Sequence, residues 1–111
     1  MKANELIREN RWLLDDDMAE LKAIILDADI LGGMKFYCLN NSLGHSYDNH
    51  GGGVAISIDE LKRLVESHEL VKDYYGLTRA KEHAESNYTA PEIKNALKQA
   101  IADVESCMEV S

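Results

Sequence analysis

Apolar residues repeat with a helical period along the first thirty residues of the chain. Six of them occupy the a and d positions of three heptads: Ile7, Leu14, Met18, Leu21, Ile25 and Ala28. The pattern predicts a long N-terminal helix, with an apolar stripe broad enough to pack on more than one neighbour. Three consecutive aspartates, Asp15-Asp16-Asp17, lie inside this segment. Our prediction is a single helix, kinked at the aspartates. The alternative is a second helix that begins near Asp17 and is capped by an aspartate.

Two short apolar runs follow the glycine pair Gly32-Gly33, which ends the helical pattern. Residues 34–39 and 53–57 are rich in β-forming side chains and predict the two strands of an antiparallel hairpin. The segment between them, about thirteen residues, would be a loop far longer than most hairpin loops. Because a two-stranded sheet is only marginally stable in water, the hairpin needs a helix on one face.

The second half of the chain carries helix start and stop signals. Ser57-Ile58-Asp59-Glu60 is a capping box that predicts a helix over 58–75. A shorter helix with a narrow apolar edge is expected over 77–86. Thr89-Ala90-Pro91-Glu92 is a second capping box, with proline in the first turn of a last helix that runs to about Cys107.

These elements predict one domain over residues 1–111, in the mainly helical α+β class. We expect a long N-terminal helix, a small two-stranded antiparallel sheet and two to three further helices. Composition agrees, because 45% of the residues are apolar and only one is proline. The heptad stripe over residues 7–28 predicts a homodimer through this helix. The same stripe could instead be filled within the monomer by the helices at 58–75 and 91–107.

The chain is acidic, with 20 Asp and Glu residues against 12 Lys and Arg residues and a net charge of −8. Such a surface repels phosphate backbones and anionic membranes, so we expect no direct nucleic-acid binding and no membrane binding. It favours encounter with a basic protein surface, although acidity also keeps small proteins soluble. The two cysteines have no Cys-x-x-Cys spacing, and no signal-peptide or membrane-spanning pattern is present. We therefore expect a cytoplasmic protein with reduced thiols.

The polar segment over residues 40–53 is the most unusual part of the sequence. Its candidate ligand-binding residues are His45, Tyr47, Asp48, His50, Gly51, Gly52 and Gly53. Imidazole and carboxylate groups bind metals, but a His-x-x-Asp-x-His spacing is not a recurrent metal site and no fourth ligand is evident. The glycines could form an anion-binding nest, yet a strand rather than a helix is expected after them and no lysine is near. We predict no metal and no cofactor, and keep a small-ligand or metal-binding loop as the alternative function.

Signatures of catalysis are weak elsewhere in the chain. There is no Gly-x-Ser-x-Gly nucleophile motif, and Cys38 lies in an apolar strand pattern that is typical of a core cysteine. His68 falls on the apolar side of its predicted helix, where a hydrogen-bonded core histidine is expected. The aromatic residues Trp12, Tyr74, Tyr75 and Tyr88 fit either a core or a binding interface. We predict that the protein is not an enzyme.

The predicted last helix carries a family resemblance. Its sequence from Leu97 to Cys107, LKQAIADVESC, resembles the C-terminal tails of small accessory proteins of lambdoid enterobacterial phages. The resemblance covers about a tenth of the chain and includes no catalytic residue. It implies an early-region phage protein in the host cytoplasm, a class that often acts by binding host proteins.

The sequence favours a small acidic protein-binding protein with a regulatory or inhibitory action on a basic protein. The first 31 residues contain eight acids and four bases. The partner-binding carboxylates that we predict are Asp15, Asp16, Asp17, Asp27 and Asp29. In the sharpest form of this hypothesis, these carboxylates imitate the phosphates of a nucleic acid and block the site that would bind it.

Overall fold

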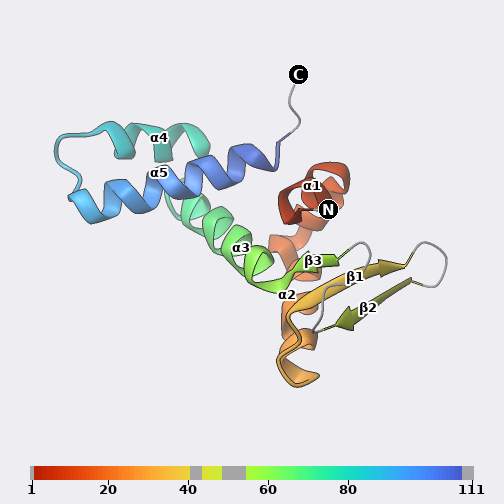
Figure 1. Cartoon of the computed structure of the whole chain (residues 1–111). Helices are drawn as coiled ribbons and strands as arrows, with labels where there is room; N and C mark the ends of the chain where they lie inside the picture. Colours follow the sequence, from red (N-terminus) through yellow and green to blue (C-terminus); the bar gives the residue numbers. More distant parts are fainter. Residues whose placement is uncertain (1, 41–43, 49–54, 109–111) are drawn as a thin grey trace.

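The computed structural model describes residues 2–40, 44–48 and 55–108, with the backbone alone at 39–40, 44–46 and 48. Within these residues the elements are α1 (Ala3–Glu9), η1 (a 3₁₀-helix, Arg11–Leu14), α2 (Asp15–Ile30), β1 (Phe36–Asn40), β2 (Gly44–Asp48), β3 (Ala55–Ser57), α3 (Ile58–Asp73), α4 (Leu77–Glu85) and α5 (Pro91–Ser106). The predicted class, mainly helical α+β, is confirmed (Figure 1).

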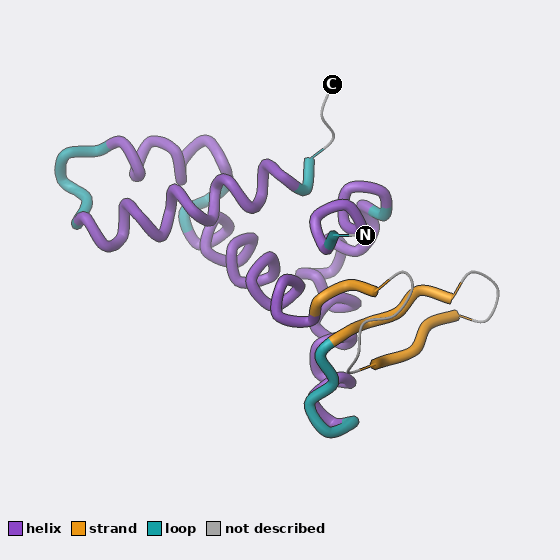
Figure 2. The backbone as a smooth tube through the Cα atoms, viewed as in Figure 1, coloured by secondary structure: helices purple, strands orange, loops and turns teal. Residues whose placement is uncertain are grey.

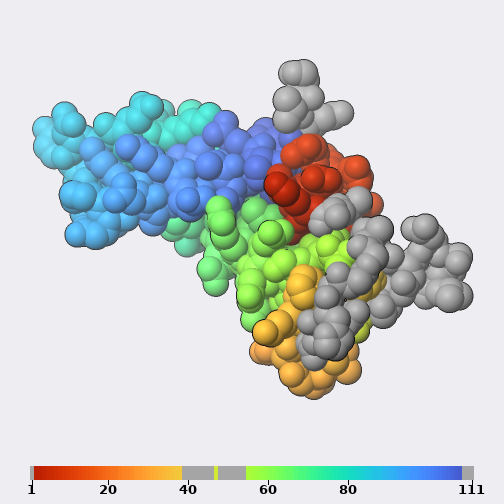
Figure 3. Space-filling view, viewed as in Figure 1, coloured from red at the N-terminus to blue at the C-terminus, as the bar shows by residue number. Residues whose placement is uncertain are grey.

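The molecule is elongated, with principal extents of 50 × 32 × 23 Å. Helix α3 runs between two groups of elements (Figure 2). At one end α1, η1, α2 and the sheet surround the first half of α3. At the other end α4 and α5 form an antiparallel pair, and α5 packs along α3. The space-filling view shows the α4–α5 pair as the narrow end of the molecule (Figure 3).

The N-terminal segment differs from the single long helix that the heptads predict. It is broken at Asn10 and again at the aspartates. The φ angles of Asp16, Asp17 and Met18 are 52°, 56° and 62°, so three successive residues are left-handed before the regular helix begins at Ala19. Left-handed backbone costs about 1–2 kcal/mol per residue, and Asp adopts it more readily than most residues. The kink predicted at the aspartates is therefore present. In the described structure no side chain caps α2, so the aspartate cap of the alternative interpretation is wrong.

The sheet has three antiparallel strands in the order β2-β1-β3. The predicted pairing of the two apolar runs is confirmed, since Tyr37 of β1 lies opposite Ile56 of β3. The segment predicted as a loop contains the additional strand β2, in which Tyr47 lies opposite Tyr37. The two tyrosine rings pack against each other with their centroids 5.6 Å apart, which helps to hold β2 on the sheet.

Helix α3 begins at the predicted residue and ends at Asp73, two residues before the end of the predicted range. The hydroxyl oxygen of Ser57 accepts a hydrogen bond of 3.3 Å from the amide of Glu60. At the other end the amide of Gly76 donates to the carbonyl oxygen of Val71 over 3.0 Å, the hydrogen bond of a Schellman motif. The left-handed position of this motif is taken by Tyr75, whose φ is 65°.

Helices α4 and α5 enclose a small apolar core with the end of α3. Its buried residues are Val71, Ala80, Ala84, Leu97, Ala100 and Ile101. Pro91 occupies the first turn of α5, as predicted. Ala90 is the N-cap residue, and no hydrogen bond from a side chain caps this end in the described structure, so the predicted second capping box is wrong.

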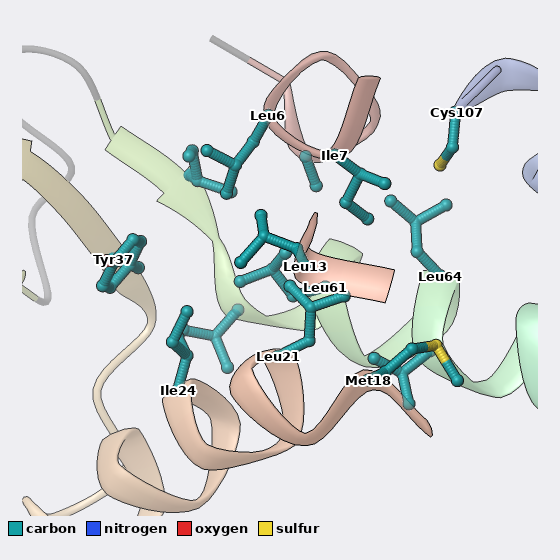
Figure 4. Close-up of a cluster of buried hydrophobic side chains, with 14 of the residues drawn as sticks. Leu6, Ile7, Leu13, Met18, Leu21, Ile24, Tyr37, Leu61, Leu64 and Cys107 are labelled. Carbon is teal, nitrogen blue, oxygen red and sulfur yellow. The ribbon is translucent and has the colours of Figure 1, made fainter. Parts of the chain in front are cut away.

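The larger core lies where α1, α2, the sheet and the first half of α3 meet (Figure 4). Leu21 and Ile24 of α2 point into it, toward Leu13 and Leu61. Its fully buried large side chains include Ile7, Leu21, Ile56 and Leu61. This core uses the heptad stripe of residues 7–28, because Ile7, Met18, Leu21 and Ala28 are at most 5% exposed. The stripe is therefore filled within the monomer and is not available as the seam of the predicted homodimer.

Candidate functional site

The five predicted partner-binding aspartates all belong to α2, and all are exposed: Asp15, Asp16, Asp17, Asp27 and Asp29. They do not form one row. Successive residues of a helix are about 100° apart, so Asp27 and Asp29 lie on opposite flanks of α2. Asp29 lines a groove shared with α3, whereas Asp27 lies on the flank that faces Tyr47 of the sheet.

Two salt bridges connect α2 to α3. Lys72 pairs with Asp17, and the Nζ atom of Lys22 lies 2.8 Å from a carboxylate oxygen of Glu69. All four side chains are about half exposed or more, so these pairs contribute little to stability. Within the described part of the chain, the other four predicted carboxylates make no salt bridge and remain available to a basic partner.

Burial and the carboxylates on the sheet side of α2 raise the pKa of two tyrosine hydroxyl groups. Burial raises the pKa of the hydroxyl groups of Tyr37 and Tyr47. The negative charge of Glu20 raises both pKa values further, and Asp27 adds to the effect at Tyr47. Both hydroxyl groups therefore stay neutral, and the charge of this flank comes from the carboxylates.

The predicted ligand loop lies only partly within the described residues. His45 and Asp48 belong to β2, where the backbone alone is described, and residues 50–53 lie outside the description. Tyr47 is half-buried and packs on the larger core beside Tyr37, which gives its ring a structural role. Among the side chains that are described, no group of three His, Cys, Asp or Glu residues is placed to hold a metal ion.

A buried carboxylate on α5, which the sequence analysis missed, is the centre of a polar network. Asp103 is 6% exposed and accepts hydrogen bonds of 3.0 and 2.7 Å from the Nε and Nη2 atoms of Arg63. Its oxygens also accept from the hydroxyl of Ser67 over 2.6 Å and from the amide of Gln99 over 3.1 Å. The signal was the position of Asp103 on the apolar stripe of α5, three residues after Ala100.

The hydrogen bonds of this network connect α3 to α5 and stabilise their packing. Burial raises the pKa of Asp103, but the hydrogen bonds from Arg63, Ser67 and Gln99 outweigh it, and the pKa lies below its ordinary value. The carboxylate is thus ionised and already accepts four hydrogen bonds. It lines an open cavity of about 300 Å³, together with Lys2 and with Ala3 and Asn4 of α1.

Three other titratable side chains are buried or half-buried within the fold: His68, Cys107 and Cys38. The Nδ1 atom of His68 lies 2.7 Å from the carbonyl oxygen of Leu64, so this half-buried ring donates the hydrogen bond that its predicted core role requires. Cys107 is 1% exposed, and burial raises the pKa of its thiol, which keeps the sulfur protonated. Cys38 is buried as well, as its strand pattern predicts.

The sequence analysis also missed an apolar stripe on the outer side of α2. Ala19, Ala23, Leu26 and Ile30 are exposed and follow one another at helical spacing. They lie on the face opposite the buried residues Leu21, Ile24 and Ala28. The sequence contains this second apolar series at i, i+4, i+7 and i+11, but it overlaps the heptad series of the inner face.

Comparison of the chain with family models, with curated proteins and with solved structures finds no match. Among the described residues, no helix is long and apolar enough to cross a membrane. A functional assignment must therefore come from the chain's own surfaces, of which the acidic helix α2 has the clearest chemistry.

Proposed function

We propose that this chain is a small, acidic, non-enzymatic protein that binds a basic surface of a protein partner through α2. In this proposal it is a phage accessory protein that acts in the host cytoplasm and regulates or inhibits a host protein. The observation that carries the proposal is the exposure of the five aspartates of α2, four of which have no salt bridge among the described residues.

The charge of the chain affects both the rate of association with a partner and the choice of partner. A chain of net charge −8 attracts a basic surface over about one Debye length, roughly 8 Å at physiological salt. Exposed carboxylates keep most of their hydration until the partner arrives, so their main effect is on the association rate and on the choice of partner. A host protein that itself binds nucleic acid has such a basic surface, and α2 would compete for it.

An affinity capture with matched charge variants tests this proposal. The immobilised chain is exposed to a nuclease-treated lysate of an enteric bacterium, and bound proteins are eluted with salt. One variant neutralises four acids of α2: Asp15→Asn, Asp16→Asn, Asp27→Asn and Asp29→Asn. The control neutralises four exposed acids of the other helices and changes the net charge equally: Asp73→Asn, Glu82→Gln, Glu85→Gln and Glu92→Gln.

We expect a basic protein to be captured by the wild type and by the control variant, but not by the α2 variant. Elution should be complete well below about 1 M salt, where the Debye length is about 3 Å. The captured protein should lose binding to nucleic acid as the wild-type chain is added. A captured protein that resists about 1 M salt, or that both variants bind equally, contradicts the electrostatic mechanism.

A further inference from the structure

The outer face of α2 is an unusual surface for a helix of a small acidic protein. Helices that lie on a core normally present polar side chains to water. On α2, however, the residues directly opposite the core are Ala19, Ala23, Leu26 and Ile30, and the side chains of Leu26 and Ile30 are 58% and 71% exposed. We call these four residues the outer stripe.

Charged residues flank the outer stripe on both sides. Glu20 and Asp27, seven residues apart, lie on the sheet side, and Lys22 and Asp29, with the same separation, lie on the α3 side. Lys22 already pairs with Glu69. In the described structure Glu20, Asp27 and Asp29 make no salt bridge, so the flanks carry uncompensated negative charge.

The α3 side of the outer stripe continues into an open groove of about 430 Å³ between α2 and α3. Ile25 and Val65 contribute apolar surface to this groove, and Leu26 lies on its border. An apolar stripe beside a groove is the surface that an amphipathic helix of a partner covers, with its apolar residues inserted at i, i+3, i+4 and i+7 spacing.

A second copy of the chain fits this face poorly. Two outer stripes brought together would also bring the carboxylates of both flanks together, with only Lys22 and Lys62 at this face of each copy to offset them. Four side chains, two of them alanine, are also far fewer than the roughly 20–30 residues per side of a standard stable interface. A partner helix with basic flanks avoids the repulsion and adds ion pairs at the rim.

We infer that the outer stripe of α2 docks an amphipathic helix of a protein partner, and that lysine or arginine residues flank the apolar side of this helix. The inference rests on the proposed function and specifies the partner's chemistry. Leu26 and Ile30 are the central apolar contacts, and Glu20 and Asp27 receive the basic residues of the partner helix.

Binding of synthetic peptides to the full chain tests the inference. The probe is an amphipathic peptide of leucine and lysine, with leucines at i, i+3, i+4 and i+7 spacing. A peptide with glutamate in place of lysine is its charge control. The apolar variant is Leu26→Ser with Ile30→Ser, and its matched control is Tyr88→Ser, because Tyr88 is fully exposed on another part of the molecule. The charge variant is Glu20→Gln with Asp27→Asn.

We expect one leucine–lysine peptide per chain and no binding of the leucine–glutamate peptide. Leu26→Ser with Ile30→Ser should weaken the affinity about tenfold or more, as the loss of central interface contacts does. The charge variant should weaken it less, mainly by slowing association, and Tyr88→Ser should leave it unchanged. Circular dichroism should show the same helix content in every variant, since all substituted side chains are exposed.

Three outcomes would overturn the inference, and they differ in whether they also exclude the proposed function. If only the charge variant weakens binding, the acidic surface acts without the outer stripe, and the proposed function stands. If the leucine–lysine peptide does not bind at about 0.15 M salt, the proposed function fails too. If light scattering shows a wild-type dimer that Leu26→Ser with Ile30→Ser converts to a monomer, a second copy covers the outer stripe instead.

Discussion

Replacement of Asp103 by alanine tests the polar network that connects α3 to α5. The substitution leaves the hydroxyl of Ser67, which is 7% exposed, without the carboxylate that accepts its hydrogen bond. A buried polar group without a partner costs about 1–3 kcal/mol. Arg63 and Gln99 are exposed and regain water, so their lost bonds add less. We expect the free energy of unfolding to fall by about 2–3 kcal/mol at pH 7.

The stability lost in Asp103→Ala should also depend on pH. Because the pKa of Asp103 is lowered in the folded chain, the unfolded chain binds a proton at this position more readily than the folded chain. The stabilisation from the ionised carboxylate is thus fully present above the unfolded pKa of about 4. It is lost as the pH falls through the lower, folded pKa. The difference between wild type and Asp103→Ala should therefore shrink below about pH 4.

Urea unfolding at pH 7 and at a series of acidic pH values measures both effects. Glu105→Ala is the matched control, because this acid lies two residues away on the same helix and makes a surface pair with Lys81. Its effect should stay within about 0.5 kcal/mol at every pH. A loss below about 0.5 kcal/mol for Asp103→Ala at pH 7, or a loss that does not shrink in acid, would refute the proposed role of the network.

Three further predictions concern single positions. Tyr75→Gly should raise the free energy of unfolding by about 1 kcal/mol in urea melts, because glycine relieves the left-handed strain and the ring is 90% exposed; a lower stability would contradict this. Ser57→Ala should lower it by about 1 kcal/mol by removing the cap on the amide of Glu60, whereas Ser57→Asp should not. Cys107 should react with a thiol reagent far more slowly in the native chain than in urea, because it is buried and its pKa is raised; equal rates would be inconsistent with the structure.

The sequence predicted best those elements whose boundaries are set by local signals. The capping box at Ser57, the glycines that end α2 and the proline at the start of α5 act over a few residues and need no tertiary partner. The apolar series of α3 and α5 at helical spacing predicted most of their buried residues, but the ends of these series, Tyr75, Ile93 and Met108, are exposed.

The sequence predicted a kink at the aspartates, but not the left-handed backbone there or the break at Asn10. Asp16 and Asp17 tolerate left-handed backbone, but nothing in the local sequence requires it. The turn permits η1 and α2 to place Leu13 and Leu21 in one core, as Figure 4 shows. This placement depends on the position of α3, and the apolar period of residues 7–28 carries no information about that position. The strand β2 was missed for a related reason, because it forms by pairing along β1 and has no apolar run of its own.

The outer stripe shows how one helix can carry two apolar patterns. The inner face of α2 uses the larger side chains Met18, Leu21 and Ile24, which α3 and the sheet bury. A helix that is apolar on two opposite faces needs cover on both, but the chain leaves Leu26 and Ile30 of the outer face 58% and 71% exposed. An uncovered stripe on a neutral protein would favour aggregation. The carboxylates on its flanks oppose contact between copies while leaving the stripe open to a helix of opposite charge. The acidity of α2 and its exposed leucine and isoleucine are therefore better explained together, as parts of one binding surface, than as separate features.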